Sequence, residues 1–187
     1  MIDNWIKDNY EYTMIWISNI KSELPIPFWI RHDPTFKKKY RDTIVTKWIE
    51  YVKTEPPEWM RQDPETQDEC GRTFAMIWIE YVKTEPPEWM IHDPIIPNNI
   101  GLTCVMLWIK HVNAEPPEWM RHDTTIQDGY GRTIAMYWII YVEAEPLEWM
   151  KHDPNIQDRY GYTLEWYWMI YVKTEPPEWM RNKEEYK

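Results

Sequence analysis

The sequence predicts an all-α protein, an α-solenoid of stacked helix-turn-helix repeats joined by β-turns and loops. The first observation is a period: YVKTEPPEWM at 51–60 returns unchanged at 81–90 and 171–180, with looser copies at 111–120 and 141–150. The second is an apolar run at helical spacing inside each period, and the third is a pair of prolines behind that run. A fixed period of about 30 residues is the sequence signature of a repeat array.

The composition is that of an acidic chain that folds. Its 187 residues include 14 Trp, 13 Tyr and 11 Met, too many bulky apolar groups for a disordered chain, and its formal net charge is −10. That charge repels phosphate backbones and anionic lipid, so neither a nucleic acid nor a membrane is an expected partner. Cys70 and Cys104 fit no disulfide framework or zinc spacing, and no signal peptide is visible. We therefore expect a soluble, intracellular (cytoplasmic) protein without cofactor or metal.

The period divides the chain into about six repeats. Residues 1–37 form a degenerate N-terminal capping repeat, in which Trp29 to Pro34 (WIRHDP) is in phase with the later copies. Each repeat in such an array contacts only its neighbours, so the repeats together form one continuous domain over 1–187. Full repeats are expected at 38–67, 68–97, 98–127, 128–157 and 158–187, the last with a short polar tail.

Each full repeat is predicted to open with a turn and a helix. Asp or Asn followed by Gly three positions later favours a turn, because the Asx side chain accepts backbone hydrogen bonds and Gly allows positive φ. The run FAMIWIEYVKTE after Thr73 has apolar residues near the i, i+3, i+4, i+7 spacing, so a helix of about 10 to 12 residues is expected. The Thr that ends each turn is a good N-cap for this helix: Thr43, Thr73, Thr103, Thr133 and Thr163.

A second, shorter helix is predicted after the prolines. Pro86 and Pro87 end the first segment, and the following Glu-Trp-Met suits the first turn of a helix of about two turns. Asp93 then stops this helix, because a residue before Pro is biased out of the α region. One Trp in each first helix and one in each second helix, such as Trp78 and Trp89, should form two ladders along the array.

These elements together resemble the ankyrin repeat. The shared features are an Asp-x-x-Gly-x-Thr turn, as at Asp128, Gly131 and Thr133, an antiparallel helix pair, and an Asp-Pro exit, as at Asp153. The resemblance covers about residues 38–182, and the opening turn is its most specific part. In ankyrin proteins the turn tips and the exposed side of the first helix bind partners. The resemblance therefore implies a non-enzymatic scaffold that binds another protein.

The candidate partner-binding residues are turn and first-helix positions that differ between repeats while the frame stays fixed. Tyr and Arg are enriched in interface hot spots, and exposed apolar patches mark partner sites. Neutral drift at these positions is the alternative interpretation. The candidates are Cys70, Arg72, Ile100, Leu102, Tyr130, Arg132, Tyr137, Ile140, Tyr160, Tyr162, Tyr167 and Ile170.

Two other functions stay open. A structural repeat that assembles end to end is the first, although the polar tail RNKEEYK disfavours stacking at that end and leads us to expect a monomer. The second is a metal-dependent phosphohydrolase or nuclease that uses the His-Asp pairs. A catalytic site needs unlike groups that converge on one point, whereas these pairs and the Glu-Pro-Pro-Glu carboxylates are translated along the array. We therefore predict no enzyme activity, and expect the Asp to close a turn and the His to cap a helix end: His32-Asp33, His92-Asp93, His122-Asp123 and His152-Asp153.

Overall fold

The fold is known from a computed structural model, which describes residues 44–181. The chain divides into two compact units, Met1–His92 and Asp93–Lys187, which we call the first and second unit. The regular secondary structure within residues 44–181 is all helical, with no strand, as the sequence predicts. The predicted N-terminal capping repeat lies outside the described residues.

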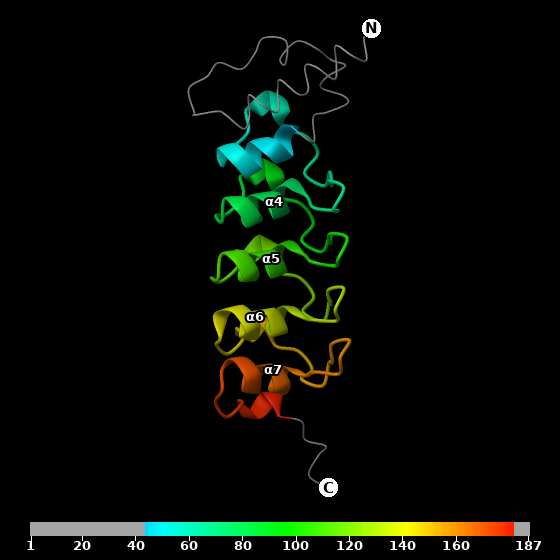
Figure 1. The fold of residues 1–187 in the computed structure, drawn as a ribbon, viewed down its shortest axis with the longest axis vertical. Helices are drawn as coiled ribbons and strands as arrows, with labels where there is room; N and C mark the ends of the chain where they lie inside the picture. Colours follow the sequence, from blue (N-terminus) through cyan, green and yellow to red (C-terminus); the bar gives the residue numbers. More distant parts are fainter. Residues whose placement is uncertain (1–43, 182–187) are drawn as a thin grey trace. The chain divides into compact units, whose positions relative to one another are not determined.

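Short α-helices alternate along the chain with single 3-10 turns (η), as the ribbon in Figure 1 shows. The first unit contains a helical segment over 44–52, η1 (Glu58–Met60), α4 (Phe74–Tyr81) and η2 (Glu88–Met90). In the second unit α5 packs against α6, and α6 packs against α7. The elements of the second unit are α5 (Cys104–His111), η3 (Glu118–Met120), α6 (Ile134–Val142), η4 (Glu148–Met150), α7 (Leu164–Tyr171) and η5 (Glu178–Met180).

The α-helices begin where the sequence predicts and end earlier. Thr73 and Thr133 are N-caps whose side chains accept hydrogen bonds from the N–H groups of Met76 and Met136. The helices have 8 or 9 residues, so the expected length of 10 to 12 is wrong. The chain leaves the helix at a left-handed residue, such as Lys83 with φ 63°, three residues before Pro86. The prolines therefore follow the helix end and do not cause it.

The second helix of each repeat is a three-residue 3-10 turn, so the expected two-turn helix is wrong as well. Pro87 is extended, with φ −54° and ψ 148°, and Ile91 is extended again after Met90. Because the prolines hold the chain extended on one side and Asp-Pro biases it out of the α region on the other, only Glu-Trp-Met is left to turn.

The core consists of the α-helices and one Met from each 3-10 turn. Met60, Met90, Met120, Met150 and Met180 are buried. The predicted Trp ladders have different environments. Trp78, Trp108, Trp138 and Trp168 in the α-helices are 6–7% exposed and belong to the core, whereas the Trp of each 3-10 turn lies half-buried at the surface. The buried ring at Trp78, Trp108, Trp138 and Trp168 therefore contributes on the order of 2 to 3 kcal/mol of transfer free energy in each repeat.

Candidate functional site

The turn tips of the second unit are held rigidly by their Asx residues. The Oδ1 atom of Asp128 accepts hydrogen bonds from the N–H groups of Tyr130 and Arg132, both at 2.8 Å. Asp158 accepts from Tyr160 and Tyr162 in the same way, both at 2.9 Å. The predicted turn chemistry is therefore confirmed, and these hydrogen bonds hold the backbone that carries the tip tyrosines.

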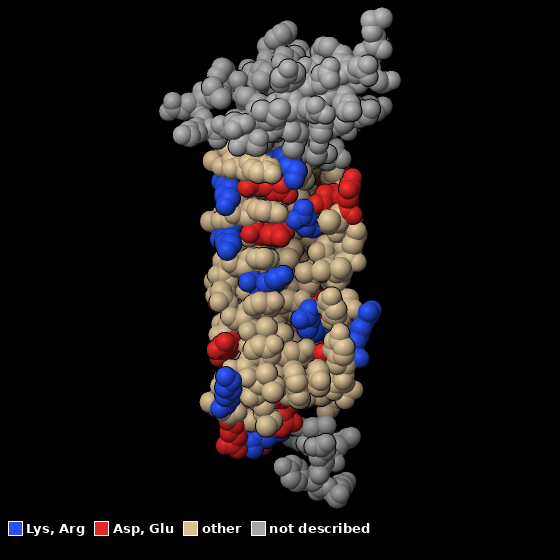
Figure 2. All heavy atoms as spheres, viewed as in Figure 1, with Lys and Arg blue, Asp and Glu red and all other residues tan. Residues whose placement is uncertain are grey.

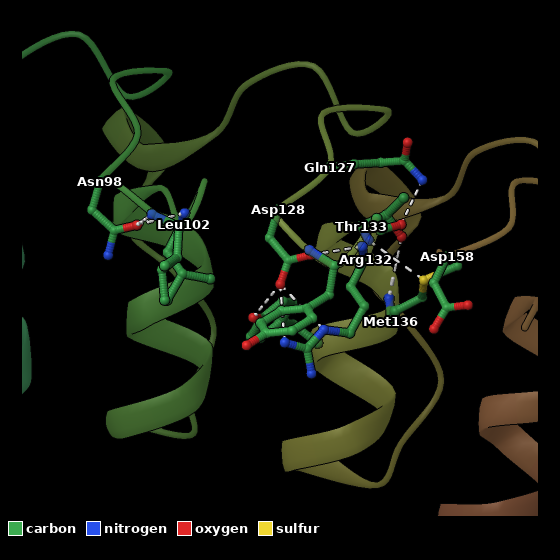
Figure 3. A network of polar contacts seen from close by, with 12 residues as sticks. Asn98, Leu102, Gln127, Asp128, Arg132, Thr133, Met136 and Asp158 are labelled. Carbon is green, nitrogen blue, oxygen red and sulfur yellow. Dashed lines mark hydrogen bonds and ion pairs between the residues drawn. The ribbon is translucent and has the colours of Figure 1, made fainter. Parts of the chain in front are cut away.

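Successive turns of the second unit are also hydrogen-bonded to each other. The N–H of Arg159 donates to the carbonyl of Tyr130 at 2.9 Å, and the N–H of Gly129 donates to that of Ile100 at 2.7 Å. The side-chain amide of Gln127 donates to the carbonyl of Gln157, one repeat further along, at 2.9 Å. Figure 3 shows Gln127 beside this row of turns. The tips therefore form one continuous edge of the second unit.

Asp128 is the centre of a buried network beneath the tips (Figure 3). Its side chain has no exposed area, and its Oδ2 atom accepts from the Tyr137 hydroxyl at 2.8 Å and from Arg132 Nη2 at 3.0 Å. Burial, followed by the hydrogen bond to Asp128, raises the pKa of Tyr137 above its ordinary value, so the phenol keeps its proton. Tyr167 donates to Asp158 at 2.7 Å and has its pKa raised for the same reasons.

Most of the exposed candidates belong to the second unit. Tyr160 is 69% exposed, Tyr130 is 46% exposed and Tyr162 is 37% exposed. We call these three residues the tip patch. Ile100 and Ile170 are exposed as well. Arg132 places its guanidinium 4.9 Å from the centre of the Tyr130 ring, so a cation–π contact orients that tyrosine.

Sequence reasoning missed Trp166. Its ring stacks on that of Tyr162, with ring centres 3.7 Å apart and planes at 12°, and therefore extends the tip patch. A signal was present, because Trp166 stands where earlier repeats have Met76, Met106 and Met136. A change from Met to Trp in an otherwise fixed frame is of the same kind as the tip variations.

The other candidates are not all surface residues. Tyr137 and Leu102 are buried, with 2% and 5% exposure, and Tyr167 is buried at 6%. Arg132 and Ile140 are half-buried. Tyr137, Arg132 and Tyr167 bond to the Asp residues of the turns, and the structure brings only part of the candidate set to the surface.

The first unit presents a different surface. Cys70 is exposed at its turn tip, and Arg72 lies between three carboxylates: Asp68 at 2.9 Å, Glu80 at 2.8 Å and Glu50 at 3.7 Å. Figure 2 shows acidic and basic side chains side by side on the visible face of this unit. In the second unit the positions that correspond to Glu50 and Glu80 include Ile140 and Ile170. The apolar and aromatic part of the candidate site therefore belongs to the second unit.

A Trp clamp, a Glu carboxylate and a basic side chain that together hold an indole, joins two of the 3-10 turns to the preceding repeat of the same unit. Glu55 accepts a hydrogen bond from the indole N–H of Trp89 at 3.1 Å, and Arg61 pairs with Glu55 and lies over the Trp89 ring. In the second unit Glu145 accepts from Trp179 at 2.8 Å, and Lys151 lies 5.1 Å from the centre of that ring. The Glu-Pro-Pro-Glu carboxylates that could suggest acid-base chemistry thus hold tryptophans.

The histidines of the His-Asp pairs bind the N-cap threonines of their own repeats. His92, His122 and His152 place Nε2 at 2.7, 3.0 and 2.8 Å from the hydroxyl oxygens of Thr73, Thr103 and Thr133. Asp123 accepts from the N–H of Thr125 two residues later, so it closes a turn as expected. The His does not cap the 3-10 turn beside it, because it reaches back 19 residues to the start of the α-helix.

We predict that acid weakens the fold through these histidines. Burial is the main cause that lowers the pKa of His122 and His152 from 6.5. The unfolded chain therefore takes up protons first, and stability that is complete above about pH 6.5 is lost as the pH falls. Urea unfolding at about pH 7.5 and about pH 5.5 should show a loss of a few tenths of a kcal/mol per histidine, since half-buried groups are screened by solvent.

The control for this prediction is the double variant H122Q/H152Q. Gln62 occupies the same position in its own repeat, so the frame accepts this side chain. The variant should lose less stability between the two pH values than the parent. Equal losses in parent and variant would show that other groups cause the acid sensitivity.

The residues 44–181 contain no group of three or more His, Cys, Asp or Glu side chains that could hold a metal ion. The same part of the chain contains no helix that is long and apolar enough to cross a membrane.

Comparisons with known proteins leave the family of this chain open. No protein-family model matches the sequence, and no curated protein matches it.

Proposed function

We propose that this protein is a non-enzymatic, ankyrin-like repeat scaffold that binds another protein through the turn tips and first helices of its second unit. The observation that carries the proposal is the tip patch, three tyrosines of which the most exposed, Tyr160, is 69% accessible. Large exposed aromatic side chains on a fixed backbone bind with little loss of conformational entropy.

The rigidity of the tips supports this proposal. The backbone N–H of Tyr130 donates to Asp128, and those of Tyr160 and Tyr162 donate to Asp158. The Tyr160 ring lies 6.2 Å from that of Tyr162, which stacks in turn on Trp166. A partner would therefore meet an aromatic surface with two arginines beside it, since Arg132 lies over the Tyr130 ring and the exposed Arg159 directly precedes Tyr160. The charge of such a rim favours acidic groups around an apolar centre in the partner.

The experiment is an affinity pull-down with the full chain as bait, followed by mass spectrometry. The parent is compared with the triple variant Y130S/Y160S/Y162S, whose fold is checked by circular dichroism. Each exposed tyrosine at a hot spot contributes about 1 to 2 kcal/mol, so we expect the variant to lose about 100-fold or more in affinity.

A matched control is Tyr51→Ser. Tyr51 is 56% exposed and lies in the first unit, outside the tip patch. This variant should retain the partner with unchanged affinity. A partner that the folded triple variant retains as well as the parent would show that the tip patch is not the binding surface.

A further inference from the structure

The last described repeat exposes a face that the following repeat covers elsewhere in the second unit. Ile109 and Ile139 have no exposed area, whereas Met169, at the same position one repeat later, is 59% exposed. Thr103 and Thr133 are likewise completely buried, and Thr163 is only half-buried. We call the surface around Met169 the end face.

The backbone of the end face is open in the same way. A Cβ atom at Gly131 would lie 2.7 Å from the nitrogen of Arg159 in the next turn, whereas one at Gly161 would meet nothing within 4 Å. The carbonyl of Tyr130 accepts from the N–H of Arg159, but no backbone N–H within residues 44–181 donates to the carbonyl of Tyr160. Both features mark the place where another turn of the same kind would fit.

A Trp clamp is also present at the end face. Glu175 pairs with Arg181 at 2.7 Å, as Glu115 pairs with Arg121 at 3.2 Å. Arg121 lies 5.2 Å from the centre of the Trp149 ring in the next repeat. Within the part of the chain that the structure describes, no aromatic ring lies over Arg181. The ion pair of the last repeat, Glu175 with Arg181, is therefore formed and could accept an indole ring.

We propose that the end face binds the N-terminal repeat of a second copy of this chain, in head-to-tail contact. The face is complementary to a repeat of this protein, since α7 presents what α5 and α6 present to the helices that follow them. In the second copy Trp29 stands 30 positions before Trp59. It therefore occupies the same position in its repeat as Trp89 and Trp179, the tryptophans of the Trp clamps.

This proposal does not rest on the proposed partner binding, although Tyr160 belongs to both surfaces, and it differs from the expectation of a monomer. A head-to-tail contact uses two different surfaces, so each added copy presents a new end face and chains longer than a dimer can form. The assembly would bury Met169 and supply an N–H donor to Tyr160 and an indole to Glu175 and Arg181.

The test is the molar mass of the full chain, measured by light scattering from low micromolar to millimolar concentration. The parent should exceed its chain mass of 23.2 kDa as the concentration rises. Met169→Arg places a charge in the buried centre of the contact, so this variant should stay at 23.2 kDa throughout. Glu175→Ala removes the indole acceptor and should weaken association by about tenfold.

The matched control is Ile95→Arg. Ile95 is 48% exposed and belongs to the second unit but to an earlier repeat than α7, so the same added charge should leave association unchanged. Near-ultraviolet circular dichroism checks that each variant folds, and if Met169→Arg does not, Glu175→Ala decides. A parent that stays at 23.2 kDa at every concentration would overturn the proposal. So would association that persists unchanged in both folded end-face variants.

Discussion

Replacing Asp128 with Ala is expected to lower the free energy of unfolding by about 3 to 5 kcal/mol, the usual cost of breaking a buried ion pair on one side. The carboxylate has no exposed area and accepts from the Tyr137 hydroxyl, Arg132 and two backbone N–H groups. Its removal leaves a buried hydroxyl and a partly buried guanidinium without an acceptor. Urea unfolding followed by Trp fluorescence measures the loss.

Asp68→Ala is the matched control in the first unit. The Asp68 side chain is 17% exposed, and position 77 is Ile77, where the second unit has Tyr137. Only the turn hydrogen bonds and one ion pair are lost, so we expect a decrease of about 1 to 2 kcal/mol. Equal losses at the two sites would contradict the assignment of the larger effect to the buried hydroxyl.

The turns and helix starts could be predicted because their causes are local. Asp128, Gly131 and Thr133 act within a few residues of each other, through Asx hydrogen bonds, positive φ and an N-cap. Each signal recurs in several repeats, which separates it from chance. The general fold class, all helical with successive helices in contact, follows from these signals and the apolar period.

The ends of the helices could not be predicted in the same way. Lys53, Lys83, Asn113, Glu143 and Lys173 adopt φ of 56–63°, yet none is the Gly that usually marks a left-handed helix end. The N–H of Lys83 donates to the carbonyl of Trp78 at 3.3 Å, which closes the end of the helix without a glycine. Three residue types, Lys, Asn and Glu, occupy this left-handed position, so no single residue type marks the helix end in the sequence.

The candidate site was predictable at its tips and less so beneath them. Tyr130 and Tyr160 follow an Asx residue by two positions, and a turn places such side chains in solvent. Tyr137 varies between repeats in the same manner, but its hydroxyl reaches Asp128 nine residues earlier, across the turn. Variation along the sequence cannot distinguish an exposed tyrosine from one that is buried by such a contact.

Replacing Gly131 with Ala is expected to cost about 3 kcal/mol or more, and the same change at Gly161 about 1 kcal/mol. Both glycines have positive φ, 82° and 85°, so both variants pay the same backbone cost for a side chain. Only at Gly131 does the new Cβ lie 2.7 Å from the nitrogen of Arg159 and 3.0 Å from Asp158. The backbone cannot move away without losing the bond from Arg159 to the Tyr130 carbonyl. Urea midpoints of the two variants give the comparison.

The variants Gly131→Ala and Gly161→Ala also distinguish an effect on folding from an effect on self-association. If a second copy seats its turn on the end face, a Cβ at Gly161 would stand where that turn's backbone must approach, as it does at Gly131 within the chain. Gly161→Ala should then lose self-association in light scattering while it remains nearly as stable as the parent in dilute solution. A Gly161→Ala variant that associates like the parent would mean that no turn docks at this position. A loss of stability equal to that of Gly131→Ala would show that the backbone conformation, and not the contact between turns, dominates both sites.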